Sequence, residues 1–345
     1  MRAAVITGPG EVEVTTVDDP VPGPREVVVA VSGCGICGTD LHILDGEFAP
    51  ALPIVPGHEF AGEVVAVGSE VGSGDPAGGS GSGGRRGLRP AVGDQVAVDP
   101  SLPCGDCHYC RRGRFTFCER WNAVGVSVAG AAAEYVAVPA ANCVRLPEGI
   151  RTADAALVEP LSCAVRGYDV LRSSLAEHYL VYGAGTMGLI MTALAMRAGA
   201  VSVDVVDVNP ARLEAARVLG CTGAVTDAAQ LDRPRGWDAV IDCTGVVEAI
   251  EDGITRVGKG GTFLQFGVAG EGATARFSPH RVYSHEITIV GSLAVLHSFD
   301  RAAELFVAGV VDPDLLISDR LPLAEYPAAV QRVRAGVGRK VQVIP

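Results

Sequence analysis

Four cysteines within the segment CGDCHYCRRGRFTFC, at positions 104–118, form the densest group of reactive side chains in the sequence. They are Cys104, Cys107, Cys110 and Cys118. Four closely spaced thiols suit a metal clamp, a redox device, a disulfide knot or a nucleic-acid finger. If they bind one zinc ion, the site has no open coordination position, so it stabilises a lobe and takes no part in catalysis.

The rest of the chain favours the metal clamp. A CxxC redox motif would need a thioredoxin-like βαβ context, which does not surround this segment. The formal net charge of -12 argues against a phosphate-binding surface, and the short basic run Arg111, Arg112 and Arg114 is better explained as a solvated loop. A chain of 345 residues can bury its own core and needs no disulfide staples. We therefore predict a structural zinc site.

A second set of metal-binding side chains is dispersed along the chain. It comprises Cys37 in GICGTDLH, His58 and Glu59 in GHE, and Glu159 in VEPLSC. A thiolate, an imidazole and carboxylates form the open N/S/O set that catalytic zinc prefers. Their spacing alone does not assemble a site, and each residue taken singly is more often structural.

The segment GAGTMG, at 183–188, matches a dinucleotide-binding fingerprint. An apolar strand precedes it and a helix follows. Gly183 permits the tight turn, Gly185 lets the backbone approach a pyrophosphate, and Gly188 lets helix and strand pack closely. Thr186 and Met187 open the helix, whose N-terminal amides would bind the phosphates.

An acidic residue, Asp207, ends the next strand at the distance expected for a ribose-binding carboxylate. It would accept hydrogen bonds from the ribose hydroxyls and repel a 2′-phosphate, which favours NAD over NADP. Arg212 lies nearby in the sequence, so binding of NADP is also considered.

The elements that must position these groups change character near residue 150. Before it, short β segments divided by Gly and Pro predict an antiparallel, loop-rich domain. After it, strands alternate with helices, which predicts βαβ units and a parallel sheet. Segment 72–90 has eight Gly and three Ser and is predicted to be a flexible surface insertion.

Composition and the N-terminal sequence indicate the class of the protein and its cellular compartment. Hydrophobic residues make up 48% and aromatic residues 5% of the chain, with 44 glycines, which suits an α/β protein. The N-terminus lacks a signal-peptide pattern and no uninterrupted apolar stretch could span a membrane. We therefore expect a cytoplasmic protein that binds neither membranes nor nucleic acids and keeps its ten cysteines as thiols or metal ligands.

The order of the motifs resembles that of zinc-dependent medium-chain dehydrogenases/reductases. The motifs are GICGTDLH, PGHEFAGEVVAVG, the four-cysteine lobe, VEPLSC, GAGTMG and the basic terminal strand. The resemblance covers essentially the whole chain. It implies a GroES-like, mostly β catalytic domain at 1–158 and 294–345, with a zinc lobe at 100–120, and a Rossmann NAD-binding domain at 159–293.

The resemblance also implies roles for the dispersed residues. Cys37 and His58 would bind the working zinc, with Glu59 and Glu159 as ligand or near-ligand carboxylates; which of the two contacts the metal is left open. Asp40 matches the acid that orients the metal-bound histidine.

A proton relay and a cofactor pocket follow from the same resemblance. Thr39 and His42 match the family's relay from the alcohol to solvent. The segments that line the nicotinamide pocket are matched by Gly245, Gly267, Val268 and Ser292. Lys340 matches a basic residue near the pyrophosphate.

The closest similarity is to the polyol (sorbitol/arabinitol-type) dehydrogenases, because VEP places a glutamate where many simple alcohol dehydrogenases have a cysteine. Ala294 and Val295 stand where sorbitol dehydrogenases have an Arg-Tyr pair, so a polyol phosphate, a diol or a ketone also remains a candidate substrate. We predict an NAD-linked oxidoreductase with two zinc ions per chain that assembles as a homodimer or homotetramer. The alternative from another class is a zinc-stabilised NAD-binding sensor without turnover.

Overall fold

The computed structural model describes residues 1–47, 51–72, 89–172 and 174–345. The chain divides into two compact units, one formed by Met1–Ser162 with Val295–Pro345 and the other by Cys163–Ala294. We call them the first and the second unit. Most of the insertion predicted at 72–90 lies outside the described residues.

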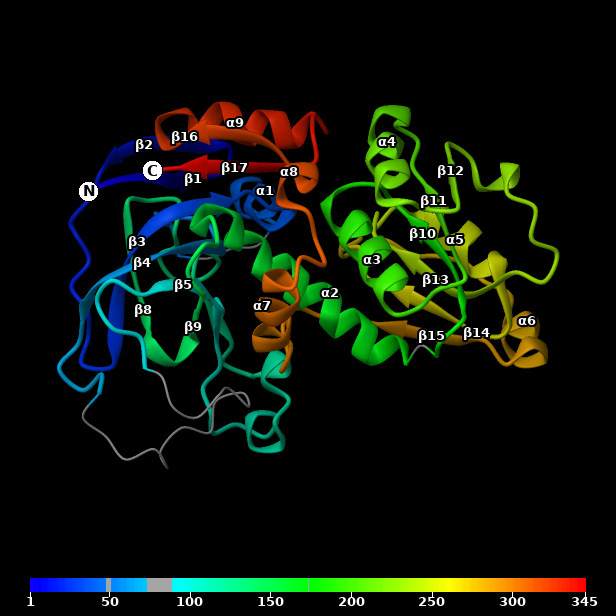
Figure 1. Ribbon diagram of the computed structural model, residues 1–345, viewed down its shortest axis with the longest axis horizontal. Helices are drawn as coiled ribbons and strands as arrows, with labels where there is room; N and C mark the ends of the chain where they lie inside the picture. Colours follow the sequence, from blue (N-terminus) through cyan, green and yellow to red (C-terminus); the bar gives the residue numbers. More distant parts are fainter. Residues whose placement is uncertain (48–50, 73–88, 173) are drawn as a thin grey trace. The chain divides into compact units, whose positions relative to one another are not determined.

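The first unit is built on a mostly antiparallel sheet with strand order β16–β17–β3–β4–β5–β9, to which β8 adds by pairing with β3. These strands are β3 (Glu26–Gly35), β4 (Glu59–Val67), β5 (Gln95–Val98), β8 (Tyr135–Pro139), β9 (Cys143–Arg145), β16 (Ile317–Pro322) and β17 (Lys340–Ile344). The C-terminal strand β17, red in Figure 1, lies beside β3, the third strand of the chain. The N-terminal and C-terminal parts of the chain therefore belong to one sheet.

Shorter elements complete the first unit. They are the hairpin β1 (Arg2–Gly8) and β2 (Glu11–Thr16), the pair β6 (Ser101–Leu102) and β7 (Asn122–Ala123), and helices α1 (Gly38–Leu44), α7 (Phe299–Val307), α8 (Pro313–Leu316) and α9 (Tyr326–Arg334). The core of this unit contains Val29, Phe60 and Val343, each with at most 1% of its surface exposed. Alternating Val positions in β3 supply most of the buried face, as expected for a β strand.

The second unit carries a parallel sheet of six strands with order β12–β11–β10–β13–β14–β15. The strands are β10 (His178–Tyr182), β11 (Ser202–Val206), β12 (Gly223–Val225), β13 (Trp237–Asp242), β14 (Val257–Gln265) and β15 (Thr288–Gly291). The helices are α3 (Thr186–Arg197), α4 (Pro210–Leu219), α5 (Val247–Arg256) and α6 (Pro279–His285), and α2 (Val158–Leu171) carries the chain from the first unit into the second. This is the doubly wound order of a dinucleotide-binding sheet, with the switch point between β10 and β13.

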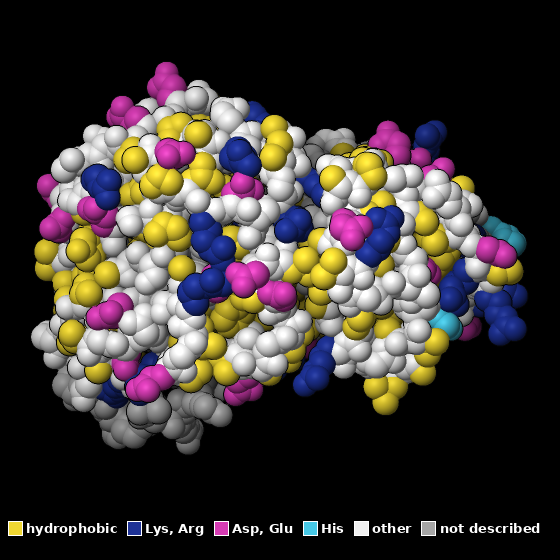
Figure 2. All heavy atoms as spheres, turned by 45° about the horizontal axis from the view of Figure 1, so that its top comes forward, with side chains coloured by type: hydrophobic (Ala, Val, Ile, Leu, Met, Phe, Trp, Pro, Cys, Tyr) yellow, Lys and Arg dark blue, Asp and Glu magenta, His cyan; other side chains and the backbone are white. Residues whose placement is uncertain are grey.

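The surface has a mixed character. On the face shown in Figure 2, Asp and Glu side chains are interspersed with Lys, Arg and apolar side chains. Among the described residues, none of the helices is both long and apolar enough to cross a bilayer.

Candidate functional site

The four cysteines of segment 104–118 converge in the first unit and form one buried group with Phe115 packed against it. The Sγ atoms of Cys104 and Cys110 are 3.9 Å apart, as are those of Cys107 and Cys118. Tetrahedral zinc with Zn–S bonds of about 2.3 Å separates its sulfurs by about 3.8 Å. Disulfide sulfurs lie at about 2.05 Å, so the geometry fits a zinc ion and not a disulfide.

The backbone of the lobe prepares the thiols for metal. Hydrogen bonds from the Cys110 and Glu119 amides lower the pKa of Cys107 to about 6. Burial raises the pKa of Cys110 to about 12, helped by its neighbouring thiols. The amides of Cys104 and Arg120 donate to Cys118 Sγ at 3.3 and 3.4 Å. Without metal the lobe therefore keeps protons that a bound zinc would release.

A second metal-binding group forms where β3 leads into α1 and β4 begins. Cys37 precedes α1, His58 precedes β4 and Glu59 is its first residue, and their ligand atoms all lie within 4.8 Å of one another. His58 Nδ1 is buried and has no hydrogen-bond partner among the described residues. An open set of thiolate, imidazole and carboxylate fits a catalytic zinc.

Asp40 ties this group together. Its side chain is 2% exposed and accepts hydrogen bonds from the amides of Cys37 (2.8 Å) and Gly57 (3.2 Å), the residue before His58. Asp40 Oδ1 lies 3.7 Å from His58 Nδ1, which is an ion-pair distance and too long for a hydrogen bond. Burial lowers the pKa of His58, but the charges of Asp40 and Cys37 outweigh it and raise this pKa well above its usual value. Asp40 thus fixes the two loops that carry the metal-binding side chains.

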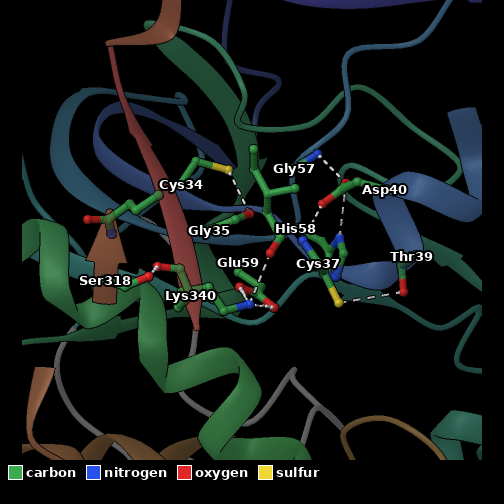
Figure 3. Close-up of polar contacts among 12 residues, drawn as sticks. Cys34, Gly35, Cys37, Thr39, Asp40, Gly57, His58, Glu59, Ser318 and Lys340 are labelled. Carbon is green, nitrogen blue, oxygen red and sulfur yellow. Dashed lines mark hydrogen bonds and ion pairs between the residues drawn. The ribbon is translucent and has the colours of Figure 1, made fainter. Parts of the chain in front are cut away.

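Lys340 is the unexpected member of this site. Its Nζ donates to both carboxylate oxygens of Glu59, at 2.8 and 2.6 Å, and to the Ile36 carbonyl at 3.2 Å (Figure 3). Burial lowers the pKa of Lys340, but the charges of Glu59, Cys37 and Glu159 raise it above its usual value. Strand β17 buries Lys340 in the first unit with 6% exposure, and its predicted contact with a cofactor pyrophosphate stays a prediction.

The two glutamates occupy different positions. Glu59 is 1% exposed and belongs to the compact group with Cys37 and His58. Glu159 is 8% exposed, lies in the first turn of α2 and is not part of that group at the same distance. It is close enough to Lys340 to raise the pKa of the ammonium. Glu59 therefore contacts the Lys340 ammonium directly, whereas Glu159 acts on it through its charge.

Thr39 and His42 lie three residues apart on α1, on neighbouring turns. Thr39 Oγ1 is 3.9 Å from Cys37 Sγ, and His42 Nδ1 contacts Glu47 Oε2 at 2.5 Å. The His42 side chain is 32% exposed. Glu47 has no motif around it, so its contact with His42 was not foreseen from the sequence.

The glycine turn of the second unit joins β10 to α3. Gly183 has a φ of +98°, which favours glycine, and a Cβ on Gly188 would overlap the Gly183 carbonyl. A Cβ on Gly185 would meet no atom of the described residues within 4 Å, so the backbone there is open to a ligand. Such a turn before the twelve-residue helix α3 fits the diphosphate of a dinucleotide.

Asp207 follows β11 and supports this turn. It accepts hydrogen bonds from the amides of Ala184 (2.7 Å) and Asn209 (2.8 Å), and Arg212 Nη1 lies 4.0 Å from its Oδ2. The aspartate is 7% exposed. It therefore stabilises the glycine turn in addition to any contact with a ribose.

The remaining predicted cofactor residues lie at the carboxyl ends of β13, β14 and β15. A Cβ on Gly245 or Gly267 would collide with neighbouring backbone, and Val268 is 70% exposed. Ser292 Oγ is buried and has no hydrogen-bond partner within the described part of the chain. The buried Asp242 accepts hydrogen bonds from the Thr244 and Gly245 amides and fixes this loop. Asp242 was not foreseen because a strand-terminal Asp has no distinctive spacing.

Comparisons with known proteins agree with this geometry. Residues 23–148 match the family model "Alcohol dehydrogenase GroES-like domain", and residues 186–308 match "Zinc-binding dehydrogenase". The chain is 33% identical to D-arabinitol dehydrogenase 1 of Uromyces fabae over 100% of this chain and 97% of that protein. It is 34% identical to D-altritol 5-dehydrogenase of Agrobacterium fabrum over 88% of this chain and 87% of that protein.

A solved structure shares the whole fold. It is described as a zinc-binding dehydrogenase from Sinorhizobium meliloti bound to NADP, with a TM-score of 0.91, 32% identity, and coverage of 100% of this chain and 99% of that chain. The full-length relatives and the two matched domains confirm the predicted fold class and its zinc and nicotinamide chemistry. The chain belongs to the zinc-dependent medium-chain dehydrogenase/reductase family.

Proposed function

We propose that this protein transfers a hydride between a secondary alcohol of a polyol-like substrate and NAD. The observation that supports it most is the convergence of Cys37, His58 and Glu59 beside Thr39, in a unit whose other metal group has no ligand position to spare. The polyol specificity rests on the substrates that the names of two relatives state. The first unit would bind metal and substrate, and the second unit NAD.

The residues around the metal group account for the proton chemistry. A zinc ion held by Cys37 and His58 would supply Lewis acidity to the substrate oxygen. Thr39 Oγ1 would accept the alcohol proton, while the hydride leaves carbon for C4 of the nicotinamide, so that the alcohol becomes a carbonyl. His42, on the next turn of α1 and partly exposed, would pass the proton to solvent.

The cofactor preference would follow from Asp207. Its carboxylate directly follows β11, where a ribose hydroxyl would bind and a 2′-phosphate would be repelled. Arg212 at 4.0 Å partly offsets that charge, so a low residual activity with NADP is expected.

Assembly and location are part of the same proposal. Strand β15 is the last strand of its sheet, and Ile289 in it is 42% exposed. Such an edge could pair with the same strand of a second copy, giving a homodimer or the building block of a homotetramer. None of the ten cysteines, all of which the structure describes, forms a disulfide, which suits the reducing cytoplasm.

Metal content and turnover test the proposal together. We expect two zinc ions per chain and NADH formation with at least one member of a panel of polyols, polyol phosphates, diols and an amino alcohol. The Cys37→Ser variant should lose one zinc and all turnover while it keeps NAD binding. A wild-type chain that binds NAD but turns over none of these compounds would support the sensor alternative instead.

A further inference from the structure

The helix α1, which carries His42 in its last turn, ends in a motif that turns the chain back on the helix. Gly46 has a φ of +76°, a left-handed conformation that favours glycine. Its amide donates to the Ile43 carbonyl at 3.1 Å, and the Glu47 amide donates to the His42 carbonyl at 2.9 Å. These two bonds define a Schellman motif, which places the second residue beyond the helix cap beside the last turn.

The motif brings a carboxylate to the imidazole of His42. In most Schellman motifs the two residues that meet in this way are apolar. Here they are Glu47 and His42, and Glu47 Oε2 lies 2.5 Å from His42 Nδ1. The two side chains are 59% and 32% exposed, and an ion pair as exposed as this contributes little to stability. Its main effect is therefore on the state of the imidazole ring.

Other parts of the first unit hold the end of α1 in place. In the turn between β1 and β2, the Gly10 amide donates to the Leu44 carbonyl at 2.6 Å. Helix α9 packs against α1, and its Arg334 Nη2 donates to Asp45 Oδ1 at 2.5 Å. Asp45 and Arg334, the charged groups beside the motif, therefore pair with each other, and the backbone that carries Glu47 is fixed from two sides.

The contact with Glu47 decides which nitrogen of His42 carries the proton. An ionised carboxylate can only accept hydrogen bonds, so His42 Nδ1 must be the donor. A neutral imidazole has one proton for its two ring nitrogens, so the lone pair is then on Nε2. In a histidine without such a partner, the form with the proton on Nε2 predominates. Glu47 therefore reverses the usual tautomer.

We propose that Glu47 is a positioning residue that keeps the proton of neutral His42 on Nδ1 and so makes Nε2 the atom that accepts the proton handed on from Thr39. The proposal rests on the proposed function, because it adds a residue to the same proton relay. When Nε2 accepts the proton, the ring becomes an imidazolium with one proton on each nitrogen. Nε2 then gives that proton to a water molecule of the solvent, which restores the starting form. Glu47 gains and loses no proton and acts only through His42.

Nitrogen-15 NMR of the histidine rings tests the tautomer in the purified full-length protein. The chain has seven histidines, and the signals of His42 are those that the His42→Asn variant lacks. Spectra are recorded at alkaline pH, where imidazole rings are neutral. The wild type should show the pattern of a proton on Nδ1, whereas Glu47→Ala should show mainly a proton on Nε2. A wild type with the proton on Nε2, or a pattern that Glu47→Ala leaves unchanged, overturns the proposal.

Turnover measures the consequence for the reaction. Glu47→Ala should lower kcat/KM for the alcohol about two- to fivefold, which is the size of effect that an exposed charge pair supports. In the His42→Asn background the same substitution should change nothing further, because Glu47 acts through His42. The matched control is Asp45→Asn, which removes a carboxylate two residues earlier and should alter neither the tautomer nor turnover. A loss that persists in the His42→Asn background, or a changed tautomer with unchanged kcat/KM, overturns the role in the relay.

The two proposals fail in different ways, because the tautomer is measured without turnover. A wild-type chain that forms no NADH with any of the alcohols overturns the proposed function, and with it the relay, whatever the His42 spectrum. NADH formation with an unchanged tautomer in Glu47→Ala overturns only the role of Glu47. The exposed Glu47 side chain leaves no buried group unpaired when it is removed, so Glu47→Ala should unfold within about 2 °C of the wild type.

Discussion

Replacing one cysteine in each metal group should affect different properties, stability in the four-cysteine lobe and turnover in the group with Cys37. Cys110→Ser removes one of four ligands from a lobe whose apolar core consists of the cysteines and Phe115. Zinc contributes about 10–16 kcal/mol to the folding of small zinc domains. If only about 4 kcal/mol of this reaches global unfolding, Tm falls by roughly 8–16 °C, since 1 kcal/mol shifts Tm by about 2–4 °C at this size.

Cys37→Ser should leave the fold intact. Cys37 is half-buried at the start of α1, and the Asp40 carboxylate accepts from its backbone amide whatever side chain it carries. We expect a Tm within about 2–4 °C of the wild type, because a small substitution outside the core costs about 1 kcal/mol or less. Turnover should fall below detection, because the metal loses a ligand.

The assay is thermal unfolding combined with zinc analysis and limited proteolysis. Cys110→Ser should hold one zinc, unfold earlier and become cleavable within 104–118, whereas Cys37→Ser should hold one zinc and resist cleavage. An inactive but stable Cys110→Ser together with an unfolded Cys37→Ser would refute the assignment of the two groups.

Three other predictions follow from the contacts described above. Gly188→Ala should weaken NADH binding and destabilise the chain by about 1–3 kcal/mol, because the new Cβ overlaps the Gly183 carbonyl; NADH fluorescence titration and urea unfolding measure both, and unaltered binding would contradict it. Asp154→Ala should cost about 1–3 kcal/mol in urea unfolding, because the buried carboxylate bridges Arg151 and Arg320. Burial raises the pKa of Asp99, so the ionised carboxylate destabilises the folded state. The stability that the protonated carboxyl contributes is therefore lost as pH rises through its folded-state pKa. Asp99→Asn should therefore raise Tm at neutral pH, and the gain should vanish in acid; a gain that grows in acid would refute this.

Local patterns in the sequence were enough to predict the four-cysteine lobe and the glycine turn. The four cysteines lie within one loop, so their spacing alone predicts a shared ion, and the structure brings their sulfurs to a common distance of 3.9 Å in two pairs. The glycine turn is equally local, since Gly183 and Gly188 must pack against each other across one strand-to-helix connection. The sequence likewise predicted a strand before the glycine turn, a helix after it and a further strand close to Asp207, which the structure contains as β10, α3 and β11.

Short strands were the weak point of the prediction. The strands β12 and β16 have no long alternating run, and β16 pairs in parallel with β17 at the edge of the sheet. Their pairing is decided by neighbours from distant parts of the chain, which the sequence does not reveal locally.

By itself, the sequence determined which residue types were available for zinc, dinucleotide and proton chemistry, because those motifs depend on neighbours within one turn or loop. Only the tertiary structure decided how Cys37, His58 and Glu59 meet, and that Lys340, 304 residues after Ile36, forms an ion pair with Glu59. The physical reason is that strand pairing and core burial set these distances, and both depend on the whole sheet.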